Sequence, residues 1–260
     1  MVINKNKIKR TILINADTTN PIYWYFTRII LDFFSNEKCA TYAIVNIENP
    51  KIKFIKSKLN EIGVFKLIYF SDFFYKTKNK FIDLKLNKES DLLKVKFSNN
   101  FSSDIIYDEL CKSQKTGMVD VSEKDIREKL NYFNKIILSS DSIIRKYKPN
   151  YILLHTNFGI LNSSLCDAAI RNNCKTLIIK NRDNILKFLN ITSKKMQLEY
   201  KEGPNIKELK SFDQNFRNYL KQLGNEYMKK RFNGKINEIG SFYAYNKRQN
   251  NYINRSHLVQ

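Results

Sequence analysis

Short apolar runs alternate along the chain with longer segments in which apolar residues recur every three or four positions. The first pattern predicts buried strands and the second predicts amphipathic helices. In the first third of the chain they predict, in order, a strand at 11–16, a helix at 22–34, a strand at 40–46, a helix at 49–62 and a strand at 64–70. This alternation is typical of the α/β class, a parallel sheet covered by helices.

A second stretch, 147–182, predicts one strand–loop–helix–strand unit with a long helix before it. These elements are expected at 122–147 (helix), 151–154 (strand), 161–171 (helix) and 176–179 (strand). Ser122 and Asp125 have the spacing of a capping box at the start of the long helix. Pro149 ends that helix, because proline disfavours helical geometry in the residue before it.

The remaining segments define the predicted domain organisation. Residues 1–182 are expected to form a Rossmann-like, doubly wound, mostly parallel sheet. Residues 71–121 are expected as an insertion over the carboxyl edge of the sheet, with an extra strand at 92–97 and the role of a lid. Residues 183–260 are expected as a helical extension. Its parts are a short helix at 183–189, a turn at 201–205, a helix at 212–232 and a polar tail at 233–260.

Composition limits the class of protein. Hydrophobic residues make up 42% of 260 residues, enough to build a core. No apolar run approaches the length of a membrane span, and the basic start lacks a signal-peptide core, so we predict a cytoplasmic protein. The four cysteines form no CxxC pair and the two histidines lie far apart, so we expect free thiols and no metal site.

The net charge of +21, from 46 Lys and Arg against 25 Asp and Glu, raises nucleic acid as a partner. Lysine outnumbers arginine, the charges spread along the whole chain, and Asn, Ile and Tyr are abundant too. We interpret the charge as a compositional bias of the source, and nucleic acid as the less favoured partner. Anionic ligands such as nucleotide phosphates, or peripheral contact with the inner face of a membrane, stay open.

Polar residues follow the predicted strand at 151–154, where ligands bind in open α/β sheets. His155 could act as a general base or bind a phosphate, or it could be a hydrogen-bonded structural histidine. Thr156 and Asn157 could bind a ligand or form a turn. Gly159 fits the turn itself. A second polar strand end is expected at Asn181-Arg182-Asp183, with Arg182 available to a phosphate.

The first strand is followed by Asp17-Thr18-Thr19-Asn20-Pro21, which contains no glycine. The chain also lacks the GxGxxG and GxxxxGK[ST] patterns, which argues against a dinucleotide enzyme and a P-loop ATPase. Asp17 could be a catalytic base, or it could cap the following helix together with its neighbours. Asn20 is a further candidate for substrate binding.

The segments KYKPNYILLHTNFGI, LCDAAIRNNCKTLIIKNR and YMKKRFNGKINEIGSFYAY resemble, in this order, the amino-terminal half of bacterial capsule and surface-polysaccharide glycosyltransferases of the GT-B type. The resemblance covers roughly residues 122–245. In that family a helix leads through a KPD turn into an apolar strand, a His-Gly loop and a helix of small residues. The later helix ends in a "kR-x-G-k" segment that leads towards a second domain.

The resemblance implies transfer of a sugar from a nucleotide-sugar donor to a hydroxyl of a carbohydrate or lipid-linked acceptor, without a metal or other cofactor. It implies Asp17 or His155 as the base, Thr156, Asn157, Gly159 and Asn20 as acceptor contacts, and Arg182 as a phosphate contact. The family binds its donor on a second Rossmann-like domain, which would start near Gln260. We therefore expect the donor-binding half to be missing here or supplied by another chain.

Two other functions stay open. One is a non-catalytic basic module that binds nucleic acid or an anionic surface, which the charge suggests. The other is a folded but inactive remnant of a glycosyltransferase. The sequence does not define the sugar, the acceptor or the linkage.

Overall fold

The computed structural model describes residues 10–35, 39–64, 66–78, 86–114, 118–182, 185–199 and 210–232. The chain divides into two compact units, residues 1–200 and residues 201–260. The second unit contains helix α10 (Gln214–Phe232), which confirms the helix predicted there. Among the described residues, the first unit contains the sheet and the helices that pack on it.

The sheet has six strands in the order β3-β2-β1-β4-β5-β6. Its strands are β1 (Arg10–Asn15), β2 (Cys39–Val45), β3 (Lys66–Tyr69), β4 (Tyr151–Leu154), β5 (Lys175–Arg182) and β6 (Ile185–Ile191). β1 to β5 pair in parallel, and β6 pairs antiparallel to β5. The α/β class and the mostly parallel sheet are thus confirmed.

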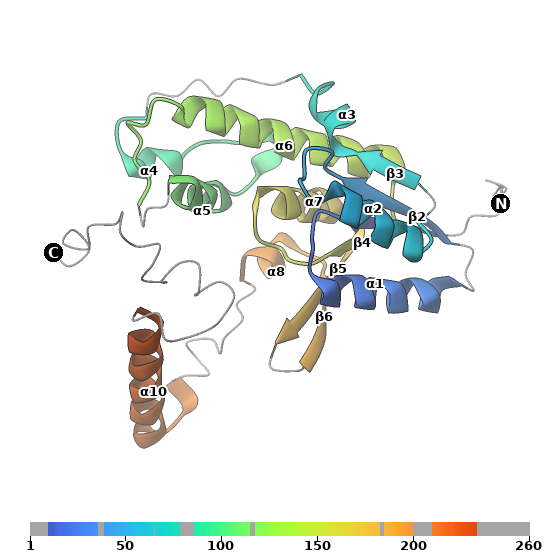
Figure 1. The fold of residues 1–260 in the computed structure, drawn as a ribbon. Coiled ribbons are helices and arrows are strands. Elements are labelled where there is room, and N and C mark those ends of the chain that lie inside the picture. Colours follow the sequence, from blue (N-terminus) through green and yellow to red (C-terminus); the bar gives the residue numbers. More distant parts are fainter. Residues whose placement is uncertain are drawn as a thin grey trace. The chain divides into compact units, whose positions relative to one another are not determined.

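Helices cover both faces of the sheet (Figure 1). They are α1 (Pro21–Phe34), α2 (Ile52–Glu61), α3 (Phe70–Phe74), α4 (Glu89–Leu92), α5 (Ser103–Gln114), α6 (Ile126–Tyr147), α7 (Ile160–Arg171) and α8 (Lys194–Glu199). α1 and α2 share one hydrophobic core with the sheet, and α6 and α7 share the other. The central strands are buried on both faces, which explains why their sequences are unbroken apolar runs.

Strand β1 shows how one short run serves both cores. Ile12 and Ile14 pack with α1 and α2, whereas Leu13 packs with α6 and α7, and all three are fully buried. This follows from the two-residue period of a strand, in which successive side chains point to opposite faces.

The insertion at 71–121 is an integral part of the core next to α6 and α7. Its buried residues are Leu92, Val95, Phe97, Phe101, Ile106, Leu110 and Val119. The strand predicted at 92–97 is wrong. α4 ends at Leu92, and the Val95 N–H donates to the Leu92 carbonyl in the turn that follows. The apolar residues of this short run are buried without pairing to a strand. Periodicity alone does not distinguish such a buried segment from a strand.

The predicted capping box at the start of α6 is wrong. Ser122 donates its hydroxyl to Asp120 Oδ1 at 2.6 Å, and the helix begins only at Ile126. Asp125 occupies the N-cap position but makes no side-chain capping hydrogen bond. Serine and aspartate bind locally in turns as readily as at helix ends, and here the turn prevails.

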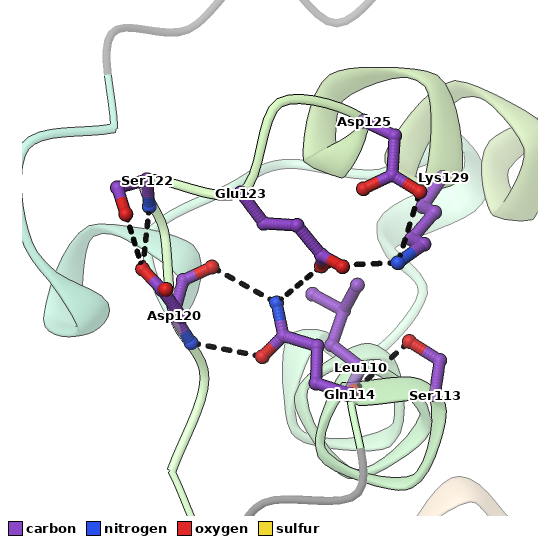
Figure 2. Close-up of polar contacts among 8 residues, drawn as sticks. All are labelled: Leu110, Ser113, Gln114, Asp120, Ser122, Glu123, Asp125 and Lys129. Atoms are coloured by element: carbon purple, nitrogen blue, oxygen red, sulfur yellow. Dashed lines mark hydrogen bonds and ion pairs between the residues drawn. The ribbon is translucent and has the colours of Figure 1, made fainter.

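A polar cluster joins the end of α5 to the start of α6 (Figure 2). Gln114 accepts from the Asp120 backbone N–H at 2.8 Å and donates to Glu123 at 2.6 Å. Lys129 of α6 then reaches both Glu123 and Asp125 at 3.0 Å. The two helices are therefore tied together by hydrogen bonds across the connection, as well as by the core.

The helix predicted at 183–189 is also wrong over its described residues, since 185–189 lie in β6. β5 continues through Asn181 and ends at Arg182, so these two polar residues form the strand end and pair with β6, while Asp183 lies outside the described residues. Pairing with β5 gives the segment partners that its local sequence does not reveal.

Across the described ranges, none of the helices combines the length and the apolar character needed to cross a membrane.

Candidate functional site

The strand order creates a topological switch point between β1 and β4. From β1 the chain runs outward to β2 and β3, and it later returns to β4 on the opposite side of β1. The segments that leave the carboxyl ends of β1 and β4 therefore diverge. In open α/β sheets ligands bind outside the strands at such a point.

Tyr23 of α1 bridges the ends of these two strands. Its hydroxyl lies 3.0 Å from the carbonyl oxygens of Asn15 and of Leu153, where the β1–β4 pairing ends. Its side chain is buried, and burial raises its pKa, so the phenol stays a hydrogen-bond donor. The Tyr23 hydroxyl thus donates to backbone carbonyls of β1 and β4 at the point where the two strands separate.

His155 follows β4 at the switch point. Burial lowers its pKa below the ordinary 6.5, while the carboxylate of Asp17 acts in the opposite direction. Its Nδ1 is shielded from solvent and has no hydrogen-bond partner within the described part of the chain. Its ring packs edge-on against Tyr23, with the ring centroids 5.8 Å apart. His155 is therefore mainly neutral at pH 7 and close to a carboxylate.

Asp17 follows β1, and it is half-buried. Its carboxylate accepts a hydrogen bond from the Asn49 side chain, which comes from the loop after β2. Its backbone N–H donates to Asn15 Oδ1 at 3.3 Å. The structure brings Asp17 and His155, 138 positions apart in sequence, close enough for electrostatic interaction.

Asn20 and Thr156 have local structural contacts. Asn20 is the N-cap of α1 and accepts from the Ile22 N–H at 3.0 Å. The Thr156 hydroxyl accepts from the Phe158 N–H at 3.1 Å. The cap of α1 is thus Asn20, so the carboxylate of Asp17 is left for other contacts.

Asn157 is turned into the protein, with 3% of its surface exposed. Its Nδ2 donates to the Gln197 carbonyl at 3.2 Å, and its own carbonyl accepts from the Ser163 hydroxyl at 2.6 Å. Gln197 in turn donates to the Ser163 carbonyl at 2.9 Å. These contacts hold the loop after β4 against α7 and α8, and Asn157 serves this purpose rather than facing solvent.

Gly159 is the N-cap of α7, with φ +79° and ψ +147°. Residues other than glycine rarely adopt this backbone conformation. The turn aims the amino terminus of α7 at the switch point, where its dipole favours an anion. Asn162 in this first turn accepts from the Asn15 side chain at 2.7 Å, so α7 is joined to the end of β1.

Arg182 is the last residue of β5, and its side chain lies outside the described atoms. Its predicted contact with a phosphate stays a prediction. Sequence reasoning missed the two residues that hold the strand ends together, Tyr23 and Asn15. Asn15 gave one signal, a polar residue within an apolar run; Tyr23 gave none among so many aromatic neighbours.

Two cavities of about 680 and 530 Å³ lie away from the switch point, at the amino ends of the strands and beside β3. In the described ranges, no three His, Cys, Asp or Glu side chains gather closely enough to hold a metal ion. No family model, curated protein or solved structure matches this chain.

Proposed function

We propose that the protein is a glycosyltransferase-like protein of surface-polysaccharide biosynthesis, related in fold to the Rossmann-like amino-terminal domain of GT-B enzymes. The reaction is transfer of a sugar from a nucleotide-sugar to an acceptor hydroxyl. The observation that carries the proposal is the meeting of Asp17 and His155 at one topological switch point. The order of motifs between residues 122 and 245 supports the family assignment.

The geometry favours His155 as the base. A histidine that burial keeps neutral can accept a proton from an acceptor hydroxyl at pH 7. Because Nδ1 is shielded from solvent, the exchange with a bound acceptor would use Nε2. The carboxylate of Asp17 would then stabilise the imidazolium through its negative charge, since no hydrogen bond joins it to His155 Nδ1.

In the GT-B enzymes that the motif order resembles, the substrates bind in a cleft between two domains, so the switch point would form one wall of that cleft. The donor-binding domain would form the other wall and enclose the sugar and the phosphates. We propose that another polypeptide, or chain beyond the described residues, supplies it.

A transfer assay with the full chain tests this function. The chain would be incubated with radiolabelled nucleotide-sugars and lipid-linked acceptors, with and without a candidate donor-binding protein from the same source. We expect His155→Gln to lower the rate at least about 100-fold, the usual contribution of a general base. His257→Gln changes the only other histidine and serves as the matched control. Equal rates for the His155 variant and the parent would refute the assignment.

A non-catalytic basic module is the second candidate, and the net charge of +21 favours it. A titration of duplex DNA at two salt concentrations separates the two functions. Tight binding with a steep salt dependence, together with no sugar transfer, would support the binding module. Weak binding at physiological salt would remove it.

A further inference from the structure

A basic groove lies at the edge of the sheet opposite the candidate active site. It has a volume of about 680 Å³ and includes the first residues of β1 and β5 and the loop between α6 and β4. Arg10, Arg145, Lys148 and Lys175 contribute four cations to it. None of the described residues that line the groove is acidic.

A second cavity shows that this arrangement is more than the average charge of the chain. It has a volume of about 530 Å³ and four lysines in its lining, but the lining also contains the acidic residues Asp72 and Asp141. Mixed charges are what a uniformly basic chain with scattered carboxylates would give. The basic groove instead combines four cations with the amides of Asn150, Asn172 and Asn173.

The carboxyl-terminal ends of α6 and α7 also lie at this groove. Their last carbonyls lack partners within the helix, so the cationic side chains could serve only to bind them. Several of these carbonyls already accept from backbone donors. Lys148 N–H binds the Ile144 carbonyl of α6 at 2.8 Å, and Asn173 and Cys174 N–H bind the Ile170 and Ala169 carbonyls of α7 at 3.2 and 2.9 Å. These three carbonyls do not need the cationic side chains as hydrogen-bond partners.

Two of the cations are well placed for a ligand. Lys148 has φ +43°, a left-handed conformation that ends α6, and its ammonium has no ion pair or hydrogen bond to a described residue. Lys175 starts β5 and lies over the ring of Tyr151 at 5.7 Å. Arg145 is paired with Asp141 at 2.7 Å but is 64% exposed, so an anion can compete for it.

We propose that the basic groove binds a compact polyphosphate, an organic di- or triphosphate. Its volume lies in the range of small-molecule sites. Its cations converge from three elements on one concavity, whereas a nucleic-acid backbone needs a stripe of charge along an extended surface. Asn150 adds a donor, because its Oδ1 is used by the Thr11 N–H at 2.8 Å and its Nδ2 is left over. This site is separate from the proposed catalytic one.

Isothermal titration of the full chain with inorganic pyrophosphate tests the proposal. We expect saturable binding that weakens as salt is raised. The variant Lys148→Asn, Lys175→Gln should bind at least about ten-fold more weakly, because charged hydrogen bonds are lost. Asparagine tolerates the left-handed conformation at Lys148, so the fold is preserved.

The control removes the same charge elsewhere, by Lys66→Gln and Lys76→Gln in the second cavity. It should bind pyrophosphate as the parent does. An equal loss in both variants would show a general charge effect and refute the site. The absence of saturable binding would refute it too, as would binding confined to anionic vesicles or duplex DNA. Circular dichroism of each variant verifies that the fold is kept.

Discussion

An ion-pair network between α6 and α7 allows a quantitative test of the fold. Asp141 and Asp167 are 7% and 3% exposed, and Arg171 lies between them. Its Nη1 is 2.5 Å from Asp141 and its Nε is 2.9 Å from Asp167. Arg145 reaches Asp141 from the surface at 2.7 Å, and Lys194 is 3.9 Å from Asp167.

Replacing Arg171 by Met would leave two buried carboxylates with weaker partners. Breaking a buried pair from one side costs about 3–5 kcal/mol of unfolding free energy. We expect the lower end, about 3 kcal/mol, because Arg145 still pairs with Asp141 and the Arg171 side chain is 27% exposed. For a unit of this size that corresponds to a fall in Tm of about 6–12 °C.

Urea unfolding followed by circular dichroism measures the change, with the slope m verifying that the folded state is comparable. Arg145→Met is the matched control, since its side chain is 64% exposed, and should cost no more than about 1 kcal/mol. Adding Asp141→Asn and Asp167→Asn to Arg171→Met should restore much of the loss, because no buried charge is then unpaired. Equal effects of Arg171→Met and Arg145→Met would refute the reasoning.

Three further predictions follow from individual residues. NMR titration should give His155 a pKa below 6.5, and Asp17→Asn should lower that pKa further, because the carboxylate of Asp17 raises it. The unfolded chain binds this proton more tightly than the folded protein, so the stability of the fold should fall as the pH drops below about 6.5. Gly159→Ala should cost about 1–3 kcal/mol through backbone strain alone, as no atom lies within 4 Å of the added Cβ, whereas Gly224→Ala in α10 should stabilise its helix. Cys166, whose pKa burial raises to about 12, should resist thiol reagents at pH 8 until the protein unfolds.

The strands could be predicted from the sequence because the central sheet is buried on both faces. That burial leaves unbroken apolar runs such as residues 151–154, which are bounded by turn residues. The positions of Asp17 and His155, which follow β1 and β4, could be predicted for the same reason. In a parallel sheet a polar residue directly after a buried strand must lie at the carboxyl edge.

The elements that sequence reasoning missed depend on contacts far apart in the chain. Strand β6 is defined by pairing with β5, and Val95 and Phe97 by burial beside α6. For Asn157 the sequence suggested a ligand contact or a turn, but not its hydrogen bond to the carbonyl of Gln197, 40 positions later. Local patterns contain neither kind of information, since the same polar residue suits a turn, a ligand contact or a buried clamp.

The positions of the two proposed sites make them experimentally independent. The basic groove includes Arg10 at the start of β1, and the candidate active site begins after Asn15 at its end. Six residues of strand separate them by about 20 Å, since a strand rises about 3.3 Å per residue. One small ligand cannot reach both, so pyrophosphate bound in the groove should leave the pKa of His155 unchanged. A shift of that pKa on pyrophosphate addition would instead place the phosphate at the switch point, near the amino terminus of α7.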